Sequence, residues 1–283
     1  MKHFFAPKSG QILYHYTTAE AAEAIIRHRT LRLSEFSMMN DKSEYVYARS
    51  KFVEAYQNRE VFVEEVPRYM ANIKLNTHES ATVMMVGCLT EDRDDVGLWE
   101  RYADRGSGCV LGFDALWLAE RAGVAIRRVS YDPEYLREFV NAGLAMLQSH
   151  YEENMDDREE LAQLAAMFVM DLYAFKDPRF HSEREVRVSR LTLTEKAASY
   201  GLRDPGGHRG DGTEIPALPI QLRQGQYGPT RFIDLPLWDD GLRSAIRSVG
   251  FGPIADPDKV ALVKGTVEEN TDITFWTSDV PLR

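Results

Sequence analysis

The sequence predicts an α+β fold in which a split, mainly antiparallel sheet is flanked by helices. Segments with the alternating apolar pattern of strands are mixed with helical patterns, without the strict alternation of a doubly wound parallel sheet. The chain has 283 residues, of which 44% are hydrophobic, enough for a substantial core. No internal repeat or heptad run divides it. We therefore expect a single α+β domain over residues 1–283.

The N-terminal part combines short strands with helices. The first strand pattern ends at a threonine, Thr17 or Thr18, which is a suitable N-cap for the amphipathic helix that follows. A polar turn contains Asn40, Asp41 and Glu44, and its spacing resembles a cap that leads into another helix. The predicted elements are strands 11–17 and 31–33 and helices 21–28, 45–56 and 60–75.

The middle of the chain contains the most apolar strand pattern. Its side chains are almost continuously apolar, which predicts a strand buried on both faces at the centre of the sheet. The helix that follows carries Trp99 and Tyr102, three positions apart. The predicted elements are strands 82–89, 109–113 and 124–131 and helix 96–103.

Two long helical patterns form a helical insertion near residues 133–176, and Pro178 ends the second one before an acidic strand. Residues 201–216 are rich in Gly and Pro and predict a flexible loop, which we expect to return beside the candidate site near the end of that strand, either as a plain connector or as a substrate lid. The predicted elements are helices 133–153, 158–175 and 240–248 and strands 183–187, 218–222, 231–235, 260–263 and 273–276.

Composition and missing motifs narrow the class of protein. The net charge of −10 argues against a surface that is basic throughout and coats nucleic acid. The first residues do not have the pattern of a signal peptide, and no stretch is apolar enough to span a membrane, so we expect a cytoplasmic protein. Cys88 and Cys109 lie in apolar contexts and are predicted to be buried free thiols. Glycine-rich nucleotide loops, hydrolase elbows and zinc-binding helices are not found.

Two strand patterns carry polar side chains that are candidates for a site. His15 and Thr17 share one face of the first strand, and Glu183, Glu185 and Arg187 share one face of the acidic strand. Two carboxylates and a guanidinium are costly to bury without a ligand or a partner. The acidic strand is therefore a candidate site, and a cross-strand ladder of salt bridges is the alternative.

Three further side chains have both a functional and a structural interpretation. Trp99 and Tyr102 could stack on a planar ring, or they could belong to the core like most helix aromatics. His15 could bind a ribose hydroxyl or be a core histidine with its hydrogen bonds satisfied. The residue types alone leave both alternatives open.

A combination of motifs resembles a family of bacterial proteins known as a domain of unknown function. The motifs are LYHYT at 13–17, W-x-x-Y-A at 99–103 and E-x-E-x-R at 183–187, in this order and with similar segments between them. The resemblance covers roughly residues 11–190. The C-terminal third of the chain is similar only loosely.

The layout of that family in turn looks like the ADP-ribosyltransferase fold, and the resemblance implies NAD as a substrate. In that superfamily a first-strand residue touches the nicotinamide riboside, an aromatic residue stacks on nicotinamide, and a later glutamate acts at the anomeric carbon. By order of elements these correspond to His15, Tyr102 and Glu185. Thr90 occupies a position like the Ser/Thr of the toxin-like branch, and Glu183 is similar to the first glutamate of its Glu-x-Glu motif.

The implied chemistry is physically coherent. Cleavage of the nicotinamide–ribose bond develops positive charge on the ribose, which the carboxylate of Glu185 would stabilise. Glu183 would orient or deprotonate the nucleophile, and Arg32 or Arg187 would clamp the pyrophosphate; no metal is expected. The predicted site comprises catalytic Glu183 and Glu185 and NAD-binding His15, Tyr16, Thr17, Arg32, Thr90, Trp99, Tyr102 and Arg187.

The leading hypothesis is an ADP-ribosyltransferase-like enzyme that cleaves NAD and transfers ADP-ribose, consistent with a bacterial toxin or antiviral defence. The acceptor, whether protein, nucleic acid or small molecule, and the oligomeric state are left open. One alternative is a nuclease or phosphotransferase with a metal held by Asp41, Glu44, Glu183 and Glu185. The other is a non-catalytic module in which the same residues only bind a nucleotide.

Overall fold

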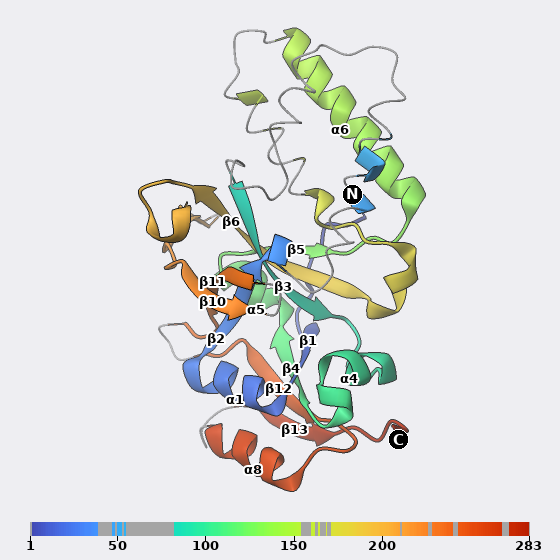
Figure 1. Ribbon diagram of the computed structural model, residues 1–283, viewed down its shortest axis with the longest axis vertical. Coiled ribbons are helices and arrows are strands. Elements are labelled where there is room, and N and C mark those ends of the chain that lie inside the picture. Colours follow the sequence, from blue (N-terminus) through green and yellow to red (C-terminus); the bar gives the residue numbers. More distant parts are fainter. Residues whose placement is uncertain are drawn as a thin grey trace.

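A large, mainly antiparallel sheet lies at the centre of the computed structural model (Figure 1). The structure describes residues 2–38, 47–48, 50–52, 54, 82–153, 160–161, 164, 168, 171–209, 211–225, 228–239, 243–267 and 272–282. Within these residues the sheet has 11 strands. Its main path, in spatial order, is β10 (Gln221–Gly225), β11 (Gly228–Pro236), β2 (Thr30–Glu35), β3 (Thr82–Thr90), β1 (Ile12–Thr17), β4 (Cys109–Asp114), β12 (Ile246–Phe251) and β13 (Thr274–Thr277).

The other strands join this path through β6 (Glu185–Thr194), which pairs with β3. β5 (Ala125–Arg128) and β7 (Leu202–Arg203) pair with β6, whereas β8 (Gly207–His208) and β9 (Glu214–Ile215) form a separate ribbon. The helices are α1 (Ala19–His28), α4 (Val96–Tyr102), α5 (Ala115–Arg121), α6 (Pro133–Glu153) and α8 (Pro257–Thr266), and the 3₁₀ turns are η1 (Phe36–Met38), η2 (Asp104–Gly106), η3 (Pro178–Glu183) and η4 (Ser199–Gly201).

The central strand β3 is where the sheet splits. One edge of β3 pairs with β6 along its whole length. The other edge pairs with β2 at Met85 and Val86 and then with β1 at Thr90. β1 and β2 therefore diverge between these contacts, beside Gly87–Leu89, and α1 connects them. This divergence leaves room for a cavity in the face of the sheet.

Local sequence signals explain why α1 begins and ends where it does. The side chain of Thr18 accepts a hydrogen bond from the backbone N–H of Ala21, and Arg29 ends the helix in the left-handed conformation. Ala22 and Ile26 are buried against the sheet in the main core. The helix thereby packs on the sheet while it connects β1 to β2.

A second apolar cluster lies outside the main core and is built around α6. In Figure 1 this helix projects from one end of the sheet, opposite α1 and α8. Its buried face packs with Phe168, Leu172 and Phe175. The described residues between 160 and 172 are helical, as expected for the second helix of the predicted insertion.

The predicted α+β class with a mainly antiparallel sheet and flanking helices is confirmed. Most predicted elements before residue 153 that lie in the described residues are found with small shifts at their ends. The predicted helices 45–56 and 60–75 lie largely outside the described residues. Further along the chain, the predicted strands 231–235 and 273–276 correspond to β11 and β13.

Four predictions in the C-terminal half need correction. The predicted strand 260–263 lies inside α8, which the N-cap Asp256 and Pro257 initiate. The predicted helix 240–248 overlaps β12, which pairs with β4 and β13. The predicted strand 218–222 begins only at Gln221, as β10. Strand β6 begins at Glu185 rather than at 183, because Arg184 adopts a left-handed conformation after η3.

Candidate functional site

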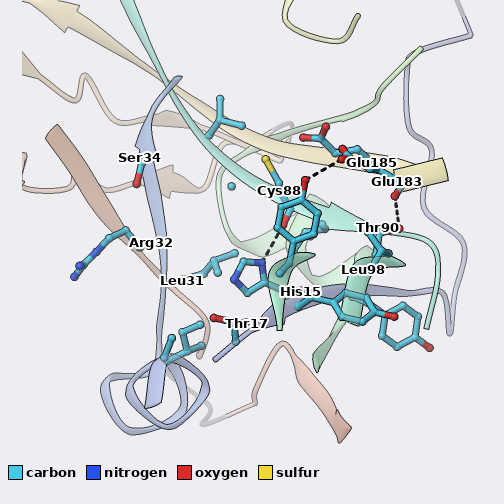
Figure 2. Close-up of a pocket in the computed structure, with 18 of the residues that line it drawn as sticks. His15, Thr17, Leu31, Arg32, Ser34, Cys88, Thr90, Leu98, Glu183 and Glu185 are labelled. Carbon is cyan, nitrogen blue, oxygen red and sulfur yellow. Dashed lines mark hydrogen bonds between the residues drawn. The ribbon is translucent and has the colours of Figure 1, made fainter. Parts of the chain in front are cut away.

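A cavity of about 600 Å³ opens where β1 and β2 diverge. Its walls come from β1, α1, β2 and β3, from Leu98 and Tyr102 of α4, and from the segment that contains Lys176, Glu183 and Glu185. Figure 2 shows Arg32 and Ser34 on one side, Glu183 and Glu185 on the other, and His15 between them. A volume of this size is typical of pockets that bind small molecules and cofactors.

The turn before β6 places Glu183 next to Glu185 although Glu183 is not in the strand. The hydroxyl of Thr90 donates to the backbone carbonyl of Glu183 at 2.7 Å, and Thr90 is also the register partner of Glu185. Thr90 lines the pocket, and its hydroxyl holds this turn in place. Both glutamate side chains are buried and line the pocket.

Glu185 is held as an anion by two cations. The Nε and Nη2 atoms of Arg187 donate to its two carboxylate oxygens at 2.7 and 2.9 Å, and Lys176 donates to Oε2 at 3.2 Å. Burial raises the pKa of the Glu185 carboxyl, but the attraction of Arg187 and Lys176 outweighs it, so the pKa lies below its ordinary value. Arg187 is itself buried and does not line the pocket, so in this arrangement it faces Glu185 rather than a pyrophosphate.

Glu183 is bound by three side chains, Arg101 and Tyr102 from α4 and Lys176 from the segment before η3. Its Oε1 accepts hydrogen bonds from Arg101 at 3.0 Å and from the Tyr102 hydroxyl at 2.8 Å, and its Oε2 accepts from Lys176 at 2.6 Å. Burial raises the pKa of Tyr102, and the negative charge of Glu183 raises it further, so this phenol remains a donor at neutral pH. Tyr102 is 42% exposed.

The two aromatic residues of α4 occupy different environments. Tyr102 lines the pocket, whereas Trp99 is fully buried and does not. The ring of Trp99 packs edge-on against Tyr16 and Trp276, and its indole N–H donates to Asp94. The core interpretation therefore holds for Trp99, and only Tyr102 is in position to contact a ligand in the pocket.

The three predicted residues of β1 all line the pocket. The Nδ1 atom of His15 lies 2.9 Å from the backbone carbonyl of Cys88, which can only accept, so Nδ1 carries the proton. Burial lowers the pKa of His15, although this hydrogen bond raises it in part, which favours neutral imidazole with Nε2 as an acceptor. Tyr16 donates to Asp92 and accepts from the N–H of Asp95, and Thr17 ends the strand.

The opposite wall carries arginine side chains. Arg32 forms a two-bond pair with Asp234 at 2.9 and 3.2 Å and lies 3.8 Å from the centre of the Phe232 ring. Arg223 of β10 lines the same wall and donates to Ser34 at 3.4 Å. Of the two arginines predicted to clamp a pyrophosphate, Arg32 lines the pocket and Arg187 does not, and Arg223, which the sequence did not indicate, lines the same wall as Arg32.

The predicted convergence of His15, Tyr102 and Glu185 on one cavity is confirmed. The predicted position of the loop 201–216 beside it is wrong, because β7 pairs with the far end of β6, at Leu193 and Thr194. Its described residues do not line the pocket, and Arg203 pairs with Glu195 instead.

The residues of the metal alternative are only partly described. Two of its four carboxylates, Asp41 and Glu44, lie outside the described residues. Among the residues that the structure does describe, His, Cys, Asp and Glu side chains do not gather in a group of three or more that could hold a metal ion.

The described part of the chain contains no helix that is long and apolar enough to cross a membrane. Cys109 is a buried free thiol, as predicted, whereas Cys88 is half-buried at the pocket.

Sequence reasoning missed two side chains that organise the carboxylates. Lys176 contacts both glutamates, and Arg101 contacts Glu183. Lys176 follows Phe175 shortly before the E-x-E-x-R motif, and this Phe-Lys pair resembles one in the family of unknown function, which was the available signal. Arg101 lies on a short helix of mixed character, and nothing in its local pattern distinguishes it.

The fold and the pocket define a mixed α/β protein with a buried carboxylate pair in a sheet-lined cavity. Residues 98–188, which run from α4 into β6, match the model of a family described as "Protein of unknown function (DUF2971)". This segment contains Tyr102, Lys176, Glu183 and Glu185. The match agrees with the predicted resemblance to a family of unknown function and carries no link to ADP-ribosyltransferases. No curated protein and no solved structure matches the chain.

Proposed function

We propose that the pocket binds NAD, cleaves its nicotinamide–ribose bond and transfers ADP-ribose to an acceptor. The observation that carries this proposal is the pair of buried carboxylic side chains, Glu183 and Glu185, in one cavity with His15 and Tyr102. Side chains from β1, α4 and β6 meet there, although they are far apart in the sequence.

The two carboxylates suit different steps of this reaction. Bond cleavage develops an oxocarbenium-like charge on the ribose, and a negative charge fixed beside it lowers the barrier. Glu185, fixed by Arg187 and Lys176, supplies such a charge. Glu183 is bound partly by Arg101 and Tyr102, which are themselves partly exposed, so a hydroxyl nucleophile can replace one of them and lose its proton to Glu183.

The remaining walls suit the rest of the dinucleotide. The Nε2 atom of His15 can accept a hydrogen bond from a ribose hydroxyl, and the ring of Tyr102 offers a face to nicotinamide. Arg32 is held in a fixed orientation by Asp234 on the wall away from the carboxylates, where it can pair with a pyrophosphate. Apolar side chains, Leu31 and Ile25 among them, line the space between these polar groups.

The position of Lys176 bears on the metal-dependent alternative. Its ammonium lies within 2.6 and 3.2 Å of the carboxylate oxygens that a shared cation would use. A divalent ion between Glu183 and Glu185 would have to displace it and approach Arg187 as well. The charge arrangement therefore favours an organic ligand over a metal at this pair.

The direct test is release of nicotinamide from NAD by the purified protein, measured by chromatography with and without chelator. We expect turnover that does not depend on a divalent metal and that falls about 10²–10³-fold in Glu185→Gln. Glu195→Gln is the matched control, because Glu195 is exposed and pairs only with Arg203 among the described residues. NAD binding without any nicotinamide release would favour the non-catalytic module, and turnover abolished by chelator would favour the metal enzyme.

A further inference from the structure

A buried ammonium group lies between the two carboxylates of the pocket. The Nζ atom of Lys176 is 2.6 Å from Oε2 of Glu183 and 3.2 Å from Oε2 of Glu185, and its side chain is 4% exposed. It also lies 4.9 Å from the centre of the Phe180 ring. A lysine in such surroundings is fixed at its charged end, unlike lysines whose ammonium groups are in water.

The backbone of Lys176 is anchored before its side chain enters the pocket. Its N–H donates to the carbonyl of Ser130 at 3.1 Å, beside the bridge that pairs Ser130 with Phe175. Phe175 is buried in the apolar cluster built around α6. The ammonium is thus placed by the packing of the helical region against the sheet.

We propose that Lys176 is a positioning residue that holds the carboxylates of Glu183 and Glu185 together as one acidic pair on the pocket wall. This role rests on the proposed cleavage of NAD. Two carboxylates that share one partner repel each other, and without the cation between them one would turn away. A shared ammonium offsets this repulsion and holds both in one geometry, which the stabilisation of a charged transition state requires.

The other groups around the pair do not duplicate this contact. Arg187 of β6 bonds to Glu185, whereas Arg101 and Tyr102 of α4 bond to Glu183. Lys176 donates to both. Among the described residues, the charged and titratable groups that contact the pair are Arg101, Tyr102, Lys176 and Arg187, with Tyr131 and Cys88 beside Glu185.

The first experiment compares nicotinamide release by Lys176→Met, Lys176→Arg and the exposed control Lys196→Met across pH. We expect Lys176→Met to lower kcat about 100-fold with little change in KM, since the substrate still binds but meets a misplaced pair. The acidic limb of its pH profile should move to higher pH, because Lys176 is one of the cations that hold the pKa of Glu185 below its ordinary value. Lys176→Arg should keep the acidic limb of the wild type. A Lys176→Met protein with wild-type kcat and pH profile would overturn the proposal.

A second measurement needs no turnover and separates this inference from the proposed function. Urea unfolding is compared for Lys176→Met, Glu183→Gln and the double variant. If Lys176 acts through the carboxylate of Glu183, the double variant should be more stable than Lys176→Met, because the uncompensated charge is removed. Strictly additive losses would overturn the positioning role. A wild-type protein that releases no nicotinamide would refute the proposed function and leave this cycle valid. If Lys176→Met does not fold, recovery of folding in the double variant gives the same answer.

Discussion

The hydroxyl of Tyr102 donates a 2.8 Å hydrogen bond to Oε1 of Glu183, across 81 positions of the sequence. Tyr102 comes from the helix after the central strand, and Glu183 comes from the turn before β6. The bond joins two side chains that line the pocket, the aromatic candidate Tyr102 and the acidic candidate Glu183. Tyr102 can therefore act on the site in two separable ways, through the face of its ring and through the hydrogen bond from its hydroxyl to Glu183.

These two contributions can be measured apart. We expect Tyr102→Phe to keep KM for NAD and to lower kcat about tenfold, because one hydrogen bond to a charged partner is lost while the ring remains. Tyr102→Ala should raise KM as well, because the ring face is removed. Steady-state kinetics on both variants checks this. Tyr200→Phe is the control, since Tyr200 is exposed and does not line the pocket. Unchanged KM in Tyr102→Ala would contradict a stacking role.

Trp99, three positions before Tyr102, should behave as a core residue. Its side chain is fully buried and packs against Tyr16 and Trp276. We expect Trp99→Ala to lower the free energy of unfolding by about 3–5 kcal/mol, through the cavity that it leaves. Urea unfolding followed by circular dichroism measures this. A Trp99→Ala protein with wild-type stability but a raised KM for NAD would show instead that Trp99 takes part in NAD binding.

The contrast between Trp99 and Tyr102 shows what the sequence can and cannot predict here. Spacing predicted the short helix, but it could not tell which aromatic faces the core, since that depends on where β13 and Glu183 lie. Period-2 alternation did predict that Glu185 and Arg187 share a face, and they form a buried pair. The apolar run at 260–263 reads equally well as strand or helix, and the Asp256–Pro257 start decided it. The Phe-Lys pair marks Lys176 in the sequence, but its contact with both glutamates depends on the packing of Phe175 near α6, which the sequence pattern does not reveal.

Arg32 tests the anionic end of the pocket. It is already oriented by Asp234, so a phosphate would pair with a guanidinium that loses little freedom on binding. We expect Arg32→Ala to raise KM for NAD about tenfold or more without a large change in kcat, and Arg32→Lys to recover only part of the loss. Arg203→Ala is the control, because Arg203 is exposed and pairs with Glu195 away from the pocket. Equal KM in Arg32→Ala and wild type would leave this wall without a role in NAD binding.

Glu185 makes the stability of the fold depend on pH in the acidic range. Burial raises its pKa, but Arg187 and Lys176 lower it by more, so the pKa in the folded protein is below that in the unfolded chain, about 4.3. The unfolded chain therefore binds the proton first. The stabilising contribution is present above about pH 4.3 and is lost as the pH falls through the folded-state value.

Removal of this carboxylate should therefore cost most at neutral pH. We expect Glu185→Gln to lower the free energy of unfolding by about 3–5 kcal/mol at pH 7, because Arg187 stays buried without its carboxylate. The difference from wild type should shrink below about pH 4, as the Glu185 carboxyl of the unfolded wild-type chain takes up a proton before that of the folded protein. Urea unfolding, measured at intervals of about one pH unit between pH 3 and pH 7, shows whether the free energies of unfolding of the variant and the wild type converge. Glu195→Gln should show a small difference throughout, since its ion pair with Arg203 is exposed. A Glu185→Gln difference that stays constant down to pH 3 would mean that the pairing with Arg187 and Lys176 does not hold Glu185 as an anion.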